Sequence, residues 1–274
     1  MATSSQARAL ERRAAPSRPA APSLLERLRP ALLPALSIGA LFVLWQLAAL
    51  FADSPNRLPT PVAVLARMFE YTASGELPYQ LGITLARVAA SFVLAMVIGT
   101  AIGIVMGRQP LVDRIAHPWL VFFLNVPALV TIVLSYIWIG LVETAVIVAV
   151  AINKIPNVVV TLREGARALD KSLLEMAWAF RIGRRRTLRQ VVLPQLYPYL
   201  AAAARSGLAL IWKIVLVTEL LGRSSGVGFE IGLHFQLFDV TGILAYTIAF
   251  VAVIQLIEWT IVLPLERHVS RWRR

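Results

Sequence analysis

Long runs of hydrophobic residues alternate with short polar segments along this 274-residue chain. Six runs are long enough to cross a bilayer, because about 20 helical residues span a hydrocarbon core of roughly 30 Å. They cover residues 30–52, 84–107, 115–142, 144–162, 197–221 and 240–265. Pro118 and Pro127 are expected to kink or break the third run. The pattern predicts an all-α, polytopic membrane protein with six transmembrane helices.

The polar segments between these runs predict the organisation of the chain. Residues 1–29, rich in Ala, Arg, Pro and Ser, are expected to form a disordered basic tail. Residues 30–83 are expected to hold the first transmembrane helix and an outer loop. Residues 84–265 are expected to form the core of the transmembrane domain, followed by a second basic tail at 266–274.

The basic residues are unevenly distributed, and this predicts the orientation of the chain. Of the 27 Lys and Arg residues, 21 lie in the two tails, in the 108–114 loop and in the 163–205 segment. The loops on the other side hold only Arg57, Arg67 and Arg223. Cytoplasmic loops are enriched in Lys and Arg, so both termini and the 163–205 segment are expected on the cytoplasmic side. Topology therefore accounts for the net charge of +12, and nucleic acid is not an expected partner.

Several kinds of chemistry have no support in the sequence. There is no Cys, which excludes disulfides and thiolate metal sites, and the three His residues form no metal-binding motif. No G-x-x-x-x-G-K-[ST] motif occurs, so no ATP-binding loop is expected in this chain. An enzyme is therefore not indicated.

The second hydrophobic run carries Gly99, Gly103 and Gly107 at four-residue spacing. Small residues on one face allow close approach of two helices in lipid. We expect this face to pack within the chain, in preference to a contact between subunits.

Charged residues inside the hydrophobic runs mark candidates for a solute pathway, because such residues usually face a cavity or a partner. Lys154 and Lys213 would line a path for an anionic solute; alternatively, they pair with Glu219 or Glu143, or extend towards the membrane surface. The polar residues of the third to fifth runs are the candidates for the pathway: Asn125, Ser135, Tyr136, Asn153, Lys154, Lys213 and Glu219.

The cytoplasmic segment around residue 180 combines a short helix with five arginines between Arg181 and Arg189. Ser172 and Glu175 have the spacing of a capping box that starts a helix. An apolar stripe follows on Leu174, Ala177, Trp178 and Ile182. Such a helix either lies on the membrane surface or docks into a groove of a soluble partner.

This segment resembles the "EAA" loop of the permease subunits of binding-protein-dependent ABC importers. The matching positions are Glu175 and Ala177, followed by Val191, Leu193 and Pro194, with 19 positions from the glutamate to the proline. Two positions depart from the family pattern: Met176 replaces an Ala, and Arg181 replaces the usual Gly, with Gly183 two places later. The resemblance extends from about residue 84 to the C-terminus.

The resemblance is closest to the nitrate, sulfonate and taurine branch, through the segment "SSGVGF" and the ending "PLERHVSRWRR". It implies the fold of a type I importer permease in a bacterial inner membrane, with residues 172–182 as the coupling helix. The residues implied in coupling are Glu175, Ala177, Trp178, Arg181, Gly183, Leu193 and Pro194.

The resemblance also implies the partners of the chain. These are cytoplasmic ATPase subunits that hold ATP and Mg²⁺, a periplasmic solute-binding protein, and a second permease subunit in a homodimer within the lipid. Two alternatives remain open from the residues alone: a secondary transporter or channel that works without an ATPase, and a membrane scaffold without transport activity.

Overall fold

The computed structural model describes residues 24–52, 54 and 57–264. The chain divides into two compact units, Met1–Asp53 and Ser54–Arg274. The first unit contains α2 (Leu24–Phe51), which begins six residues before the first predicted span, and its apolar part is Leu36–Phe51. Residues 1–23 and 265–274, which contain most of the two predicted tails, lie outside the described residues.

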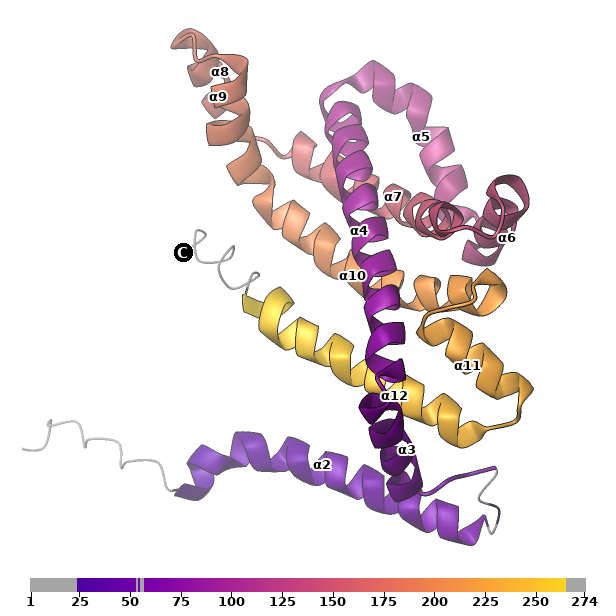
Figure 1. Cartoon of the computed structure of the whole chain (residues 1–274). Coiled ribbons are helices and arrows are strands. Elements are labelled where there is room, and N and C mark those ends of the chain that lie inside the picture. The colour runs from indigo at the N-terminus through magenta and orange to yellow at the C-terminus, as the bar shows by residue number, and fades with distance from the viewer. Residues whose placement is uncertain (1–23, 53, 55–56, 265–274) are drawn as a thin grey trace, which may run out of the picture. The chain divides into compact units, whose positions relative to one another are not determined.

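The second unit is built from helices and their connections over its described residues (Figure 1). In chain order they are α3 (Pro61–Ala73), α4 (Glu76–Arg108), α5 (Pro110–Asn125), α6 (Ala128–Ile139), α7 (Glu143–Arg167), α8 (Lys171–Ala179), α9 (Arg184–Thr187), the π-helix η1 (Leu188–Val192), α10 (Leu193–Gly222), α11 (Val227–Gln236), α12 (Val240–Ile257) and the π-helix η2 (Glu258–Val262).

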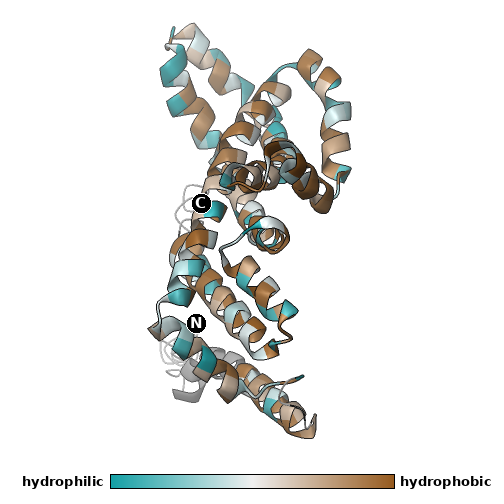
Figure 2. Ribbon diagram, turned by 45° about the vertical axis from the view of Figure 1, so that its right-hand side comes forward, coloured by the Kyte–Doolittle hydropathy of each residue, from teal (hydrophilic) through white to brown (hydrophobic). Residues whose placement is uncertain are grey.

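Four helical runs in the described part are long and apolar enough to cross a membrane, and hydrophobic residues dominate them (Figure 2). They are Glu76–Arg108, Glu143–Arg167, Arg184–Gly222 and Val240–Ile261. The helical membrane class is therefore confirmed, whereas the number of spans in the described residues is four, or five with a bent pair.

The break expected at Pro127 in the third predicted run is confirmed. Helices α5 and α6 are bent by 96° at this point, which is the geometry of a broken span or of a re-entrant loop. The break lies at Val126 and Pro127, both with extended backbone, because a proline disfavours a helical conformation in the residue before it. Pro118 stays inside α5 and does not interrupt it.

Much of the segment predicted as an outer loop before residue 84 is helical, because α3 and the first turns of α4 occupy it. Thr60 caps α3 by accepting a hydrogen bond from the backbone N–H of Ala63 at 3.3 Å, and Pro61 occupies the first turn. Val64 is buried, and α3 packs on α12 and α4. Its short, amphipathic sequence did not stand out beside the long hydrophobic runs.

Helices α4 and α7 pack closely through the glycine face of α4. A Cβ atom added at Gly99 would lie 2.6 Å from the Cβ of Val158, and one added at Gly103 would lie 2.8 Å from the Cβ of Leu162. Such distances are below van der Waals contact, so only glycine permits this approach. The predicted packing within the chain is confirmed.

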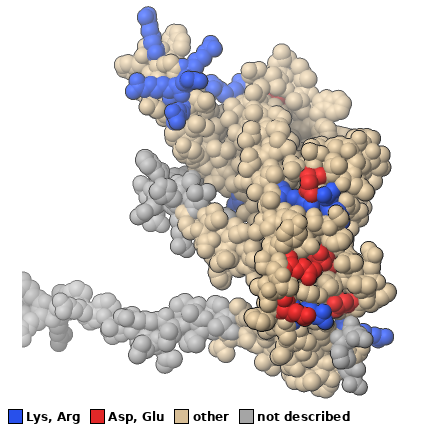
Figure 3. All heavy atoms as spheres, in the orientation of Figure 1, with Lys and Arg blue, Asp and Glu red and all other residues tan. Residues whose placement is uncertain are grey.

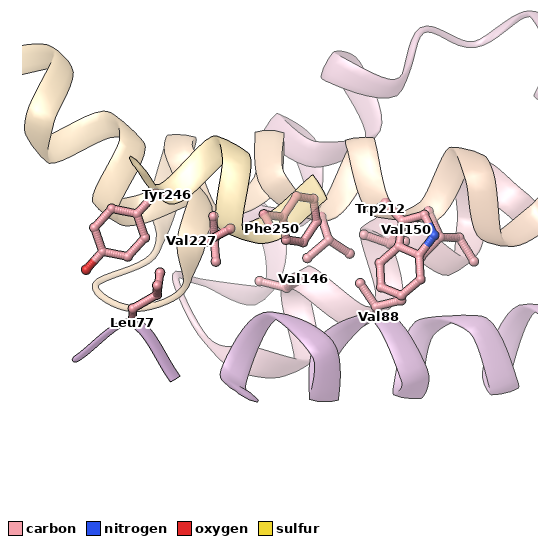
Figure 4. Packing of buried hydrophobic residues seen from close by; sticks show 11 residues of the cluster. Leu77, Val88, Val146, Val150, Trp212, Val227, Tyr246 and Phe250 are labelled. Atoms are coloured by element: carbon pink, nitrogen blue, oxygen red, sulfur yellow. The ribbon is translucent and has the colours of Figure 1, made fainter. Parts of the chain in front are cut away.

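A hydrophobic cluster joins the spanning helices. Val88 of α4, Val146 and Val150 of α7, Trp212 of α10 and Phe250 of α12 pack together in it (Figure 4). The cluster holds the helices on which the polar side chains described below are placed.

Candidate functional site

Helix α8 begins one turn after the end of α7, and its N-cap is Asp170. The Asp170 carboxylate accepts hydrogen bonds from the backbone N–H of Ser172 at 2.8 Å and from its hydroxyl at 2.6 Å. These bonds hold the pKa of Asp170 below its usual range, so that a negative charge lies at the positive end of the helix. The predicted capping box of Ser172 and Glu175 is wrong, because Ser172 already lies within the first turn and Glu175 is exposed in the middle of the helix.

The C-terminus of α8 ends in a left-handed turn centred on Arg181, whose φ is 51°. The backbone N–H of Arg181 donates to the carbonyl of Trp178, and that of Ile182 donates to the carbonyl of Ala177, both at 2.9 Å. This pair of bonds is a Schellman motif, in which glycine is the usual residue at the left-handed position. The turn therefore forms with arginine in place of the family's glycine.

The two faces of α8 differ from the predicted stripe. Ala177 is buried and Leu174 packs against a core cluster of α7 and α10 residues, as expected. Trp178, by contrast, is 84% exposed and Phe180 is 76% exposed. Trp178 lies about 100° around the helix from Ala177, which turns it away from the core. The inward stripe is therefore narrower than predicted, and an aromatic surface faces outwards.

The segment after α8 continues into a spanning helix. Gly183 is the N-cap of α9, and Leu193 and Pro194 lie in the first turn of α10. Because Pro194 has no N–H to donate, the helix passes through η1, where the N–H of Leu193 reaches the carbonyl of Leu188 five residues back. Helices α9, η1 and α10 thus form one continuous run that ends at Gly222.

A hydrogen bond ties the start of α8 to this run. The backbone N–H of Asp170 donates to the Gln195 side-chain carbonyl at 2.8 Å. The coupling candidates therefore lie on one segment that this bond ties to α10: Glu175, Ala177, Trp178, Arg181 and Gly183 belong to α8 and the turn after it, whereas Leu193 and Pro194 lie in the first turn of α10.

The pathway candidates do not form one site. Asn125 is exposed at the end of α5, where its amide donates to the Val121 carbonyl at 2.7 Å. Ser135 is buried in α6, and Tyr136 donates its hydroxyl to the Thr218 carbonyl at 2.6 Å. Asn153 is half-buried on α7.

Glu219 belongs instead to a buried polar network centred on Arg87, a residue that is not among the predicted site residues. The Arg87 side chain is only 3% exposed. Its Nη1 donates to Glu219 at 2.8 Å, and its Nε and Nη2 bind both oxygens of Glu143 at 2.8 and 2.7 Å. A bidentate arginine–carboxylate pair of this kind has both directional and electrostatic strength.

The same network holds the loop between α10 and α11. Arg87 also donates to the Ser225 carbonyl at 2.7 Å, and Glu219 accepts the backbone N–H of Gly228 at 2.8 Å. Thr84 donates to Glu219 and accepts the N–H of Val227 at 2.8 Å. The segment that contains "SSGVGF" is therefore bound to α4 and α10.

A signal for this network was present in the sequence. Gln80, Thr84 and Arg87 lie at positions i, i+4 and i+7, on the same face of α4 as the glycines. Arg87 is also a charge within a hydrophobic run, the criterion that selected Lys154 and Lys213.

The proposed pairing of the lysines with Glu219 or Glu143 is wrong, because Arg87 occupies both carboxylates and Arg223 adds a second contact to Glu143 at 2.5 Å. Lys154 is 2% exposed, and no ion pair involves it among the residues described. Its Cε lies against Gly207 of α10, where an added Cβ would be 2.9 Å away.

Lys213 differs from Lys154 in that it is exposed, on the outward face of α10. Ala202, Ser206 and Ala209 are exposed at the helical spacing that leads to it. Since a lysine in the middle of a spanning helix is costly in lipid, this face is suited to a cavity or a partner.

These features agree with the sequence family that the chain matches. Residues 99–266 match the family described as "Binding-protein-dependent transport system inner membrane component". The chain belongs to this family of ABC importer permeases. The permease is therefore a multi-pass membrane protein that serves transport.

The permease is similar to named members of the sulfonate, taurine and nitrate branch. It is 32% identical over 243 residues to SsuC of Bacillus subtilis, named as an aliphatic sulfonates transport permease, covering 88% of this chain and 86% of SsuC. It is 28% identical to the taurine transport system permease TauC of Escherichia coli, covering 86% and 89%. It is 26% identical to the nitrate import permease NrtB of Synechocystis, covering 72% and 74%.

The fold is similar to that of a chain in the MetNI methionine ABC transporter, solved in inward-facing conformations. The TM-score is 0.58 at 20% sequence identity, with 69% of this chain and 94% of that chain covered. The permease therefore has the type I importer fold.

Proposed function

We propose that the permease forms part of the translocation pathway of an ATP-driven importer for a small anionic solute of the sulfonate, taurine or nitrate kind. A second copy of the chain completes the pathway, and a periplasmic solute-binding protein delivers the solute. ATP and Mg²⁺ bind to a separate cytoplasmic ATPase. Both termini lie on the cytoplasmic side of a bacterial inner membrane.

Coupling to the ATPase is supported by the outward face of α8. Trp178 and the C-cap Phe180 are both largely exposed, whereas Ala177 between Met176 and Trp178 is buried and anchors the helix. Exposed aromatic side chains on a rigid element are typical of the central contacts of a protein interface. We therefore favour a groove of the ATPase over the membrane surface as the place where α8 docks.

The continuous run from Arg184 to Gly222 provides a path for the coupling. A displacement of α8 passes through the Asp170–Gln195 bond and through α9 into α10. The far end of α10 carries Glu219, which binds Arg87 and the outer loop. Closure of the ATPases would thus move α10, whose other end binds Arg87 and the outer loop through Glu219. Alternating access requires such a link between the two sides of the membrane.

The outward face of α10 is the proposed wall of the pathway. Lys213 lies nine residues before the end of α10, about 14 Å along the helix. A positive side chain at this depth favours anions over cations in a water-filled path. Lys154 is covered by α10 and is not part of this wall.

The coupling role is tested by replacing Trp178 with Ala and measuring binding of the co-purifying ATPase to the permease in nanodiscs. Loss of a central aromatic contact is expected to weaken binding by about 30-fold, corresponding to roughly 2 kcal/mol. Trp138→Ala is the matched control, because Trp138 is 76% exposed on α6. Equal ATPase affinity in both variants would show that α8 is not the docking element.

The pathway role is tested with Lys213→Gln and Lys213→Arg in reconstituted vesicles. Uptake of an anionic solute such as taurine or nitrate is expected to fall with Gln and to be largely retained with Arg, which keeps the charge. Uptake that is the same in Lys213→Gln as in the unmodified permease would remove the argument for an anion path along α10.

A further inference from the structure

We propose that the ATPase partner presents an acidic surface to the arginine cluster of this permease, which we define as Arg181, Arg184, Arg185, Arg186 and Arg189. This inference rests on the proposed coupling function and deepens it. It assigns the chemical character of the partner beside the aromatic face of α8, and it makes assembly of the importer dependent on salt.

The arginine cluster is exposed and has no acidic partner in the described part of the chain. Each of its five side chains is exposed, and none forms an ion pair with a described carboxylate. In Figure 3 the basic side chains crowd at the tip formed by α8 and α9, without acidic side chains beside them on the face shown. Glu175 is the one acidic residue between Lys171 and Gln190.

Arg163 and Arg167, on the same predicted side of the membrane, form ion pairs within the chain. Arg167 binds Asp113 at 2.5 Å and Glu164 at 3.2 Å, and Arg163 binds Glu164 at 3.1 Å. The arginine cluster differs from these two residues, because no described carboxylate pairs with its side chains. Its charge is left available for an external group.

The cluster also surrounds a concave surface. A pocket of about 550 Å³ is lined by Arg185, Arg186, Leu188, Arg189 and Gln190. Arginine presents a planar fork of donors that suits carboxylates. A pocket lined by three guanidinium groups and one apolar side chain fits an acidic protein segment.

Two sources of negative charge compete for this surface, a protein and the lipid headgroups. The Asp170–Gln195 hydrogen bond lies just beyond the end of α7 at Arg167, and distances along the helical run are counted from it. Arg189 lies six residues and Arg184 lies eleven residues before Gln195 along the helical run, about 9 to 17 Å. A headgroup layer is only about 5 to 8 Å thick, so the geometry favours a protein.

The position beside the aromatic surface supports the same choice. Trp178 and Phe180 are followed in the chain by the arginine cluster, so exposed aromatic and basic side chains occur together in the α8–α9 segment. Protein interfaces commonly have this organisation, in which charged margins guide association and set specificity. The aromatic surface then supplies binding energy, and the arginine cluster selects an ATPase with a matching acidic margin.

The test compares the unmodified permease with a variant that carries Arg185→Gln and Arg189→Gln. The co-purifying ATPase is titrated onto each in nanodiscs at KCl concentrations between about 50 and 500 mM. Over this range the Debye length falls to roughly a third of its low-salt value. At low salt the variant is expected to bind roughly tenfold more weakly, with a shallower loss of affinity as salt rises. Arg108→Gln with Arg114→Gln is the control, because both arginines are exposed and the change in charge is equal.

Equal affinity and equal salt dependence of the variant and the unmodified permease would overturn the inference while leaving the coupling function intact. An effect that appears only in nanodiscs containing anionic lipid would also overturn it, since the partner would then be the headgroups. If no ATPase binds the unmodified permease, the proposed function itself fails.

A second measurement identifies the acidic contacts directly. Arg185→Lys with Arg189→Lys keeps the positive charge and adds amines that a carbodiimide links to carboxylates in direct contact. Cross-links from these positions to Asp or Glu of the ATPase are expected. If the complex assembles but no such cross-links form, the inference is contradicted.

Discussion

Arg181 occupies a backbone conformation that arginine rarely adopts, with a φ of 51° at the end of α8. The left-handed conformation costs a residue with a Cβ about 1–2 kcal/mol, whereas glycine adopts it freely. The chain retains the Schellman hydrogen bonds of the turn in spite of this cost. The turn is therefore less stable than its hydrogen bonds alone would indicate.

We predict that Arg181→Gly stabilises the C-terminal turn of α8 by about 0.5–1 kcal/mol, after the greater freedom of glycine in the unfolded chain is deducted. Hydrogen exchange of the Ile182 amide is expected to slow by about two- to fivefold. Arg181→Ala is the control, because alanine pays the same conformational cost and removes the same charge. Equal slowing in both variants would mean that charge, not backbone strain, limits the turn.

Arg87 is the residue on which the outer polar network depends, since it binds Glu143, Glu219 and Ser225 at once. Arg87→Gln leaves Glu219 buried without its charge partner, a change that typically costs about 3–5 kcal/mol. The thermal unfolding temperature of the purified permease is expected to fall clearly. Arg87→Lys is also expected to destabilise it, because lysine lacks the bidentate geometry.

The combination of Arg87→Gln with Glu219→Gln separates the two contributions. If the loss comes from an unpaired buried carboxylate, the double variant is expected to recover part of the stability. A double variant that is as unstable as the sum of the single variants would indicate independent packing effects.

At the scale of the elements, α4 uses one face for two purposes. Its N-terminal half carries Gln80, Thr84 and Arg87, which bind the loop between α10 and α11, and its C-terminal half carries Gly99 and Gly103, which contact α7. The polar half specifies which groups meet, and the glycine half sets the distance between the helices.

We predict that Gly103→Ala destabilises the permease by about 1–3 kcal/mol, because the new Cβ would lie 2.9 Å from the Val159 carbonyl and 2.8 Å from Leu162. Gly82→Ala in the same helix is the matched control, since nothing lies within 4 Å of its Cβ. The control is expected to be neutral or slightly stabilising. Thermal unfolding of both variants checks the difference, and equal stability would contradict the close packing of α4 on α7.

At the scale of the whole molecule, α10 has an exposed basic region at its start and a buried network of paired charges at its end. The arginine cluster precedes its start, and the Arg87 network lies at its far end. The topology inferred from the positive residues assigns the first region to the cytoplasm and the second to the outer side.

The absence of cysteine from the chain makes this orientation directly testable. We predict that Leu237→Cys, at an exposed position after α11, reacts with a membrane-impermeant maleimide in intact spheroplasts. Gln190→Cys is expected to react only after the membrane is permeabilised. The reverse pattern would invert the proposed topology, and labelling of both in intact spheroplasts would contradict a spanning α10.

The hydrophobic runs determined the helical membrane class, and the spacing from Glu175 to Pro194 determined the family. Both depend on local pattern: a run of apolar residues must leave water, and a motif is read along the chain. The glycine spacing on α4 also predicted a close helix contact within the chain. These properties needed no knowledge of which helix lies beside which.

The tertiary structure alone decided the partners of the charged residues and the directions of several side chains. Arg87 pairs with residues 56 and 132 positions away, a choice that depends on helix packing and that displaced the predicted lysine pairs. Trp178 faces outwards because Ala177 occupies the inward position, although both fit an apolar stripe. The sequence by itself determined what must be buried in lipid or protein, and three-dimensional packing decided which polar groups met inside it.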